Sequence, residues 1–169
     1  MTSVKRVISE PLELNRLRAL LPRESKAVLY KTLRDSKRKR AQIFKGITSL
    51  VVLYETTINK KLQGHYVVLI PRAHSIEYFS SLGRSPRDEM NTLHIDPGAF
   101  RDLLGKNYTY NRKKLQIDSY SVEDCGYWAV ARCIMSHLKL AAFQRLFVPR
   151  QLRSSDEILA VMSLLLANR

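Results

Sequence analysis

The stretch Gly64-His65-Tyr66-Val67-Val68-Leu69-Ile70 is the segment of this sequence that most strongly indicates the fold. Its apolar run from Tyr66 to Ile70 is short and contains β-branched and aromatic residues, which predicts a buried strand. His65 stands where the polar segment 59–64 meets this strand. The predicted strand therefore carries a titratable side chain at its N-terminal end, held rigidly as a general base requires.

Further strands are predicted on both sides of this segment. Enrichment in β-branched and aromatic residues predicts strands at 47–54, 76–79 and 113–117. The segment around Gly83 and Pro86 is rich in turn residues, and 105–110 is predicted as a loop.

Helices are predicted from apolar residues at helical spacing together with start and stop signals. Pro22 and Pro149 act as stops, Asp96-Pro97 as a start, and Ser154 with Glu157 as a capping box. The predicted helices are 12–21, 28–44, 96–104, 125–147 and 158–166. The expected fold class is α+β, with a central mixed β-sheet flanked by helices.

Length and composition predict one globular domain over residues 1–169. The chain has 169 residues, of which 45% are hydrophobic. No apolar run reaches the roughly 18–20 residues of a membrane span, and the N-terminus leads into no uninterrupted apolar segment of the signal-peptide kind. We therefore expect a protein that is neither secreted nor bound to a membrane.

Cys125 and Cys133 are the two cysteines of the chain. On one helix, eight residues separate them by about 12 Å, too far for a disulfide. Both thiols are expected to be free, as in a reducing compartment, with Cys133 in the core. Two cysteines and four scattered histidines give no metal-ligand spacing, so we expect no metal and no cofactor.

The net charge of +14 is high for a chain of this length and attracts polyanions. The densest basic run is Lys37-Arg38-Lys39-Arg40. It is either a solvated helix face, a nucleic-acid contact or a nuclear-import signal. Because no aromatic residues interleave with it, binding to DNA is expected to involve phosphates, without sequence preference and with strong salt dependence.

Cys125 follows a polar stretch and begins a predicted helix. The positive end of the helix dipole favours thiolate over thiol there, although a cysteine at a helix start is often just a small buried residue. Gly126 leaves room for a substrate backbone. His65 is the candidate base, because His137 lies about 18 Å along the same helix and the other two histidines occupy polar connecting segments. The Cys125–His65 pair predicts thiol catalysis.

Several motifs resemble those of the adenain-like cysteine proteases. They are Gly64-His65-Tyr66-Val67-Val68, the segment 76–83 with Pro86, and Leu115-Gln116 ahead of Cys125-Gly126-Tyr127-Trp128. These enzymes are maturation proteases of adenoviruses, virophages, polinton-type elements and several large DNA viruses, and SUMO-specific proteases share their fold. The resemblance spans roughly 47–135, and the short chain is most similar to the virophage or polinton branch.

The resemblance implies a papain-like fold of the adenain/SUMO-protease type, with Cys125 as nucleophile, His65 as general base and Gln116 as oxyanion donor. Gln116 lies nine residues before Cys125, a longer gap than the family pattern. Gln116 is thus either the donor, on a bulged loop, or an ordinary strand residue.

Ser80 stands where the family pattern has an orienting acid. A serine hydroxyl fixes the imidazole tautomer but supplies no negative charge. Glu77 is expected to face the opposite side of the strand, three residues away. We predict a Cys–His dyad steered by Ser80.

The resemblance also implies a viral maturation endopeptidase that cleaves capsid or core precursor polypeptides, located in the virion and in the cytoplasm or viral factory of the infected cell. The basic surface adds DNA as a non-specific activator. Two alternatives stay open. One is an isopeptidase for ubiquitin- or SUMO-like modifiers, and the other is a nucleic-acid-binding protein on a decayed protease fold.

Overall fold

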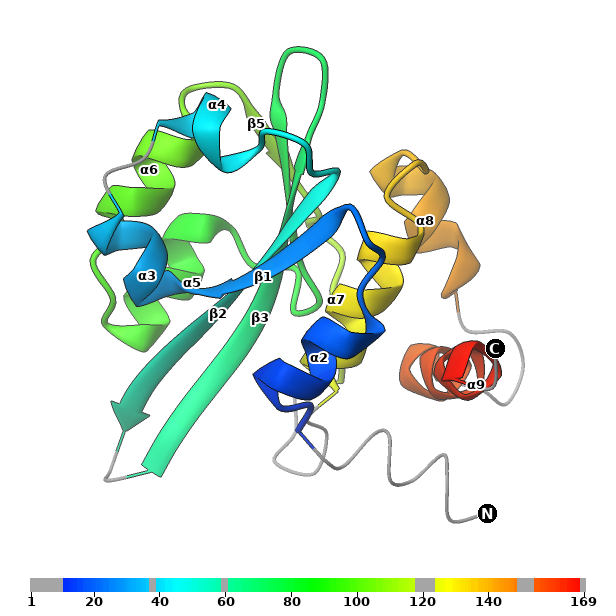
Figure 1. The fold of residues 1–169 in the computed structure, drawn as a ribbon. Coiled ribbons are helices and arrows are strands. Elements are labelled where there is room, and N and C mark those ends of the chain that lie inside the picture. The colour runs from blue at the N-terminus through cyan, green and yellow to red at the C-terminus, as the bar shows by residue number, and fades with distance from the viewer. Residues whose placement is uncertain (1–10, 37–38, 59–60, 118–123, 149–153, 168–169) are drawn as a thin grey trace.

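The computed structural model describes residues 11–36, 39–58, 61–117, 124–148 and 154–167. Its centre is a five-stranded mixed sheet in the order β1–β2–β3–β4–β5 (Figure 1). The inner pairs are antiparallel and the two outer pairs parallel. The strands are β1 (Ser25–Leu29), β2 (Ser49–Ile58), β3 (Lys61–Pro71), β4 (Ile76–Ser80) and β5 (Tyr108–Tyr110).

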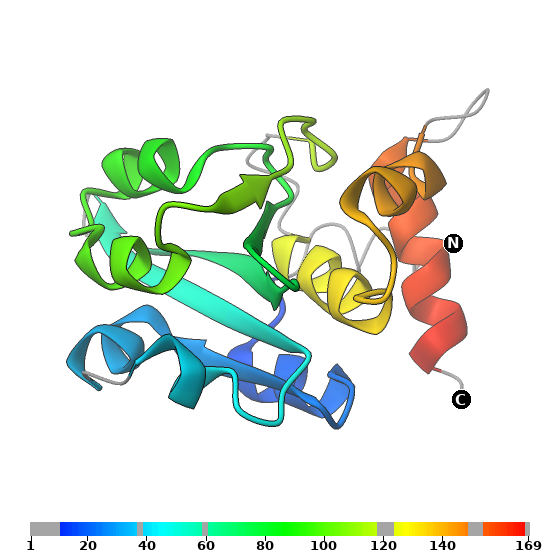
Figure 2. The same cartoon turned by 90° about the horizontal axis from the view of Figure 1, so that it is seen from above.

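Two groups of helices cover the two faces of the sheet (Figures 1 and 2). One face carries α3 (Tyr30–Asp35), α4 (Arg40–Ile43), α5 (Pro86–Leu93) and α6 (Gly98–Leu104). The other carries α2 (Leu14–Leu20), α7 (Cys125–Ile134), α8 (Leu140–Leu146) and α9 (Ser155–Ala167). This arrangement confirms the α+β class with a mixed sheet flanked by helices.

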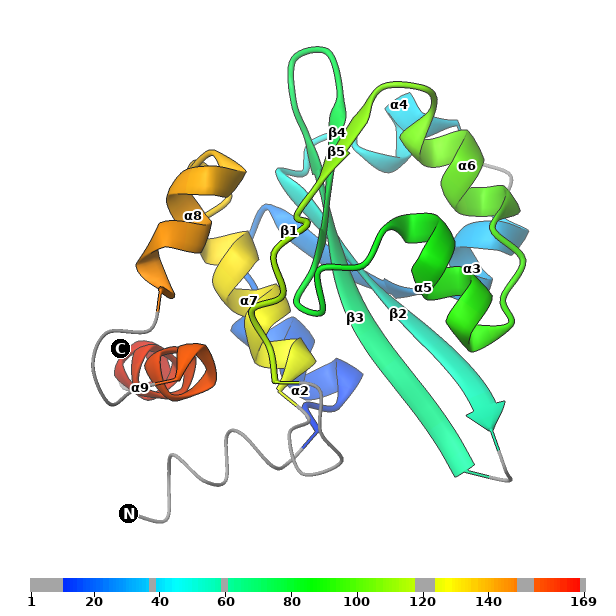
Figure 3. The ribbon, with the colours of Figure 1, turned by 180° about the vertical axis from the view of Figure 1, so that it is seen from behind.

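Alternation along the strands divides the core into two layers, one on each face of the sheet. Figure 3 shows from behind the helices that cover these two faces. On β3, Tyr66 and Val68 pack in the layer of α7, whereas Val67 and Leu69 pack in the layer of α6. His65 shares the parity of Val67. The register pairs Tyr54 of β2 with His65 of β3, and Val67 of β3 with Ser80 of β4. The polar residues Tyr54, His65 and Ser80 therefore lie close together on three neighbouring strands.

Three short segments differ from the sequence prediction, because strand pairing decides which residues join the sheet. Residues 28 and 29, predicted as the start of a helix, belong to β1 (Ser25–Leu29), which pairs in parallel with residues 49–53 of β2. Residues 108–110, predicted as a loop, form β5 beside β4. Residues 113–117, predicted as a strand, lie outside the sheet.

The helix predicted at 125–147 is interrupted, because α7 ends at Ile134 and α8 begins at Leu140. Two arginines bind the carbonyl groups between them. Arg132 donates to the carbonyls of residues 135 and 138 at 2.6 and 2.9 Å, and Arg72 donates to those of residues 136 and 138 at 2.8 and 3.0 Å. These bonds satisfy carbonyl oxygens that a helix end leaves without an intrahelical partner.

Both arginines also pair with Glu77, which is 3% exposed. Arg132 Nε and Nη2 approach Glu77 Oε1 at 2.8 and 2.7 Å, and Arg72 Nη2 approaches Oε2 at 2.7 Å. Burial lowers the pKa of Arg132, and the charge of Glu77 counteracts this. Glu77 thus faces away from Ser80, as its strand position predicts.

The helices predicted at 12–21, 96–104 and 158–166 agree with α2, α6 and α9 to within a few residues, whereas the helix predicted at 28–44 is replaced by the end of β1 and the short helices α3 and α4. The predicted capping box is present at α9, where Glu157 Oε2 accepts from the Ser154 amide at 2.8 Å and Ser154 Oγ accepts from the Glu157 amide at 3.2 Å. Within the described ranges, no helix is both long enough and apolar enough to cross a bilayer.

Candidate active site

His65 is buried on β3 and its ring is held from one side by two residues. Its Nε2 lies 3.1 Å from Ser80 Oγ and 3.1 Å from Glu89 Oε1. The Ser80 hydroxyl in turn donates to Glu89 Oε1 at 3.1 Å. The three groups form a closed triangle, which fixes both the orientation and the proton of the imidazole.

Glu89 is the residue that the sequence analysis missed. It projects from α5, is 1% exposed, and accepts a hydrogen bond from the Tyr78 hydroxyl at 2.7 Å as well as the contacts from His65 and Ser80. Tyr54 extends the network, with its hydroxyl 2.9 Å from that of Tyr78. The predicted dyad steered by Ser80 is therefore incomplete, because the Glu89 carboxylate of α5 contacts His65 Nε2 beside the Ser80 hydroxyl.

The sequence does contain a signal for α5. Ser85-Pro86 followed by Asp88 and Glu89 is a helix start, with serine as N-cap, proline at the first position and acids in the first turn. The structure bears this out, since Ser85 Oγ accepts from the Asp88 amide at 3.1 Å. Treating Gly83 and Pro86 only as turn residues concealed the helix and hence the acid.

Cys125 begins α7, and its side chain interacts with His65. Burial by itself lowers the pKa of His65, but the negative charge of Glu89, together with a hydrogen bond and the charge of Cys125, outweighs burial and raises it to about 9. Because Nε2 faces Ser80 and Glu89, Nδ1 is the nitrogen that remains for the thiol. At neutral pH this pKa favours the imidazolium form of His65.

Gln116 is held rigidly beside the end of β4. Its Oε1 accepts from the Ser81 hydroxyl at 2.6 Å, and the amides of Leu115 and Gln116 donate to the Ser81 carbonyl at 2.9 and 3.0 Å. Asn111 fixes the preceding loop, because its side chain accepts from the Ser80 amide and donates to the carbonyls of Ser80 and Lys113. The role of Gln116 as oxyanion donor stays a prediction.

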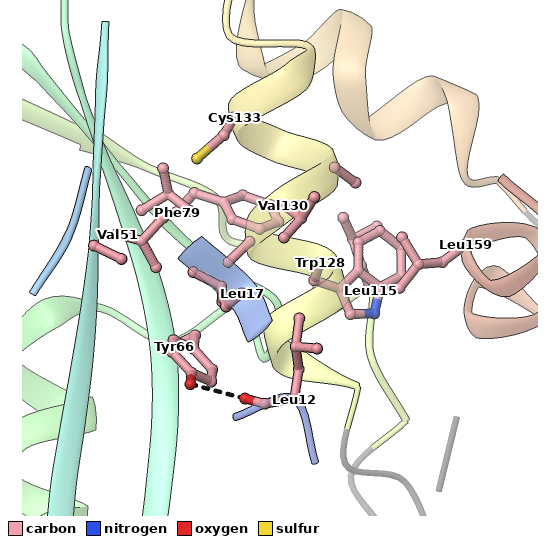
Figure 4. Packing of buried hydrophobic residues seen from close by; sticks show 14 of the residues in the cluster. Leu12, Leu17, Val51, Tyr66, Phe79, Leu115, Trp128, Val130, Cys133 and Leu159 are labelled. Atoms are coloured by element: carbon pink, nitrogen blue, oxygen red, sulfur yellow. Dashed lines mark hydrogen bonds between the residues drawn. The ribbon is translucent and has the colours of Figure 1, made fainter. Parts of the chain in front are cut away.

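Gly126 has a different reason for lacking a side chain than the one expected. A Cβ there would lie 2.7 Å from Leu12 Cβ, so the close approach comes from the chain's own N-terminal segment. The Leu12 carbonyl accepts from the Tyr66 hydroxyl at 2.8 Å (Figure 4). Leu12 and Tyr66 together cover the start of α7.

Asp124 precedes Cys125 and is fully buried. Burial chiefly raises its pKa, and the charge of Asp156 and the proton that the two acids can share raise it further, to about 9. Since this pKa exceeds the ordinary value of 3.8, the folded state holds its proton more tightly than the unfolded state does. Asp124 therefore costs stability progressively as pH rises from about 4 to about 9.

We expect Asp124→Asn to raise the melting temperature by several degrees at pH 8 and by little at pH 4, because the amide carries no charge to bury. Melting followed by circular dichroism across this pH range measures the effect. An equal shift at both pH values would contradict this account.

The other candidate residues lie apart from His65 and Cys125. Cys133 is a core residue, and burial raises its pKa to about 11; both cysteines are free. His74, His94 and His137 are exposed. No group of three or more His, Cys, Asp or Glu side chains among the described residues is placed to hold a metal ion.

The basic run is only partly described, because Lys37 and Arg38 lie outside the described residues. Lys39 and Arg40, together with Arg34, line a cavity of about 520 Å³ between α3, α4 and α6. Helices α3, α4 and α6 lie on the face of the sheet opposite α7 (Figure 1), the face that also carries α5 with Glu89.

The chain is similar to a viral protein and to several solved structures. No family model matches the chain. It is 30% identical over 110 residues to "Uncharacterized protein V9" of Sputnik virophage; the match covers 56% of this chain and 59% of that protein. The chain thus spans less than two thirds of the relative's length.

Two solved structures are similar at 11% identity. The SUMO protease Ulp1, with its catalytic cysteine oxidized to a sulfonic acid, matches 99% of this chain and 83% of its own at a TM-score of 0.45. The central domain of Lpg1148 from Legionella pneumophila matches 83% of this chain and 81% of its own at a TM-score of 0.41.

Proposed function

We propose that the chain is a cysteine endopeptidase in which Cys125 is the nucleophile, His65 the general acid and base, and Glu89 with Ser80 the pair that orients and charges His65. The observation that carries this proposal is the buried series of contacts from Glu89 through the imidazole to the thiol. A base held between a carboxylate and a cysteine is the arrangement that activates a thiol nucleophile.

In the proposed reaction the Cys125 thiolate attacks the peptide carbonyl carbon and forms a C–S bond. The amide of Cys125, and Gln116 if its amide is the donor, stabilise the oxyanion. The His65 imidazolium gives its proton to the leaving nitrogen as the C–N bond breaks. Water then attacks the thioester, His65 accepts its proton, and the thiolate departs.

The proposed substrates are capsid or core precursor polypeptides cleaved during virion assembly. The similarity to a virophage protein supports a viral setting, in the virion and in the cytoplasm or viral factory of the infected cell. The net charge of +14 supports DNA as a non-specific activator that brings enzyme and precursor together.

An activity-based thiol probe at pH 7 tests the proposed chemistry. We expect labelling at Cys125 that falls at least tenfold in His65→Ala, because the thiolate loses its counter-ion. His137→Ala is the matched control, since His137 is exposed and lies beyond α7. Equal labelling of Cys125 in all three chains would refute the proposal and favour a nucleic-acid-binding protein on a decayed fold.

Turnover of defined substrates then separates the substrate classes. We expect precursor polypeptides from the same genome to be cut faster than fluorogenic ubiquitin or SUMO conjugates, and cut sites are mapped by mass spectrometry. Faster turnover of the conjugates would instead identify an isopeptidase. Cleavage that is indifferent to DNA at low salt would remove DNA as an activator.

A further inference from the structure

The first turn of α9 contacts both sides of the candidate active site. Asp156, 1% exposed, accepts from the Ile117 amide through Oδ2 at 2.9 Å and from the Trp128 indole through Oδ1 at 3.0 Å. Ile117 follows Gln116, and Trp128 lies one turn after Cys125. One carboxyl group therefore joins the oxyanion segment to the nucleophile helix.

Neighbouring contacts reinforce this connection. The Ser155 hydroxyl donates to the carbonyl of Leu115, so that the residues on both sides of Gln116 are bound by consecutive residues of α9. Trp128 is fully buried and packs edge-on against Phe147, with ring centroids 4.6 Å apart. Figure 4 shows Trp128 beside Leu115 and Leu159, where α7, the Gln116 segment and α9 meet.

Connecting α9, the Gln116 segment and α7 through a buried carboxyl group costs free energy. An apolar side chain would pack there without the cost of removing polar atoms from water. What Asp156 adds is direction, because its two oxygens fix two donors at set distances from each other. Catalysis needs this kind of constraint, since a displacement of about 1 Å at a reacting group can cost about 100-fold in rate.

We propose that Asp156 is a positioning residue that holds the Gln116 segment in register with the Cys125 helix. This inference rests on the proposed function and deepens it. Asp156 contacts neither the thiol nor the imidazole among the interactions of the described residues. Its effect should therefore fall on oxyanion stabilisation rather than on formation of the thiolate.

Two reactions of the full chain separate these effects. Alkylation of Cys125 by iodoacetamide requires only the thiolate, whereas acylation by p-nitrophenyl acetate also requires stabilisation of an oxyanion. We expect Asp156→Asn to slow acylation by about 10- to 100-fold and to leave alkylation within about threefold of the unaltered chain. The double variant with Gln116→Ala should be no slower than the slower single variant, because both changes act through one segment.

Glu157→Gln is the matched control. Glu157 is the next residue of α9, and its carboxylate accepts from the Ser154 amide. We expect it to leave both reactions unchanged. Trp128 is the single tryptophan of the chain, so its one indole N–H resonance reports directly whether Asp156→Asn breaks the contact in a folded protein.

Each outcome supports or overturns the proposal. Acylation that stays unchanged although the indole resonance moves would overturn it and leave the proposed function intact. Equal losses in Glu157→Gln and Asp156→Asn, or additive losses with Gln116→Ala, would also overturn it. Alkylation of the unaltered chain that does not depend on His65 would refute the proposed function, and the positioning role with it.

Discussion

Glu89→Gln is expected to lower the rate of Cys125 alkylation at pH 7 by roughly 100-fold. The substitution removes the charge that opposes the effect of burial, so the pKa of His65 falls from about 9 and the imidazole becomes neutral. A hydrogen bond to a charged buried group is worth about 1.5–3 kcal/mol, and about 1.4 kcal/mol corresponds to a factor of ten. The alkylation rate and an NMR titration of the His65 ring measure the two effects.

The same substitution has a pH-dependent effect on stability whose sign is fixed. His65 binds its proton more tightly in the folded state than in the unfolded state. The stability that this proton contributes is therefore complete below pH 6.5 and is lost as pH rises through 9. Glu89→Gln should therefore cost most near pH 6 and progressively less toward pH 10. The melting temperature as a function of pH checks this.

Two variants test whether the effect belongs to this carboxylate. Asp88→Asn changes an exposed acid on the same helix and should leave the alkylation rate unchanged. Ser80→Ala removes a neutral partner and should have a smaller effect than Glu89→Gln. If Ser80→Ala proves the more damaging change, the serine and not the carboxylate is the principal group that orients His65.

Glu77→Gln is expected to destabilise the fold by about 3–5 kcal/mol, because it leaves the buried Arg132 guanidinium without its anion. For a chain of this length the loss corresponds to a fall in melting temperature of roughly 6 to 20 °C. The two arginines also hold the carbonyls between α7 and α8, so the turn should loosen as well. Urea denaturation gives the free energy of unfolding.

The double variant Glu77→Leu with Arg132→Met is the control for this ion pair. Removing both charges avoids the unpaired guanidinium, so the double variant should be more stable than Glu77→Gln. Alkylation of Cys125 in still-folded Glu77→Gln should match that of the unaltered chain, since Glu77 faces away from His65. A large loss of reactivity without loss of stability would contradict this separation.

The sequence indicated His65 and Cys125 of the candidate active site but not Glu89. His65 on a buried strand and Cys125 at a helix start are local patterns, although β3 begins at Lys61 and not at His65 as predicted. Glu89 depends on two facts that no short window contains. The segment 86–93 had to be recognised as a helix, and that helix had to bring Glu89 against His65 of β3 and Ser80 of β4.

The boundaries of elements show the same division. The strands β2, β3 and β4 follow from apolar runs that have no stable alternative to burial. In contrast, Leu29 belongs to β1 and not to a helix, because β2 supplies a parallel partner strand. Helix α7 stops at Ile134, where Arg72 and Arg132 bind the carbonyl groups that follow.

The sequence by itself therefore determined the α+β class, the main strands, the free cysteines, the basic charge, and the candidate nucleophile and base. Only the tertiary structure decided which acid meets His65, where the nucleophile helix ends, and that Asp156 joins α7 to the Gln116 segment. The reason is physical. Periodicity and propensity act over a few neighbouring residues, whereas buried polar groups are satisfied by partners that only the folded chain brings within about 3 Å.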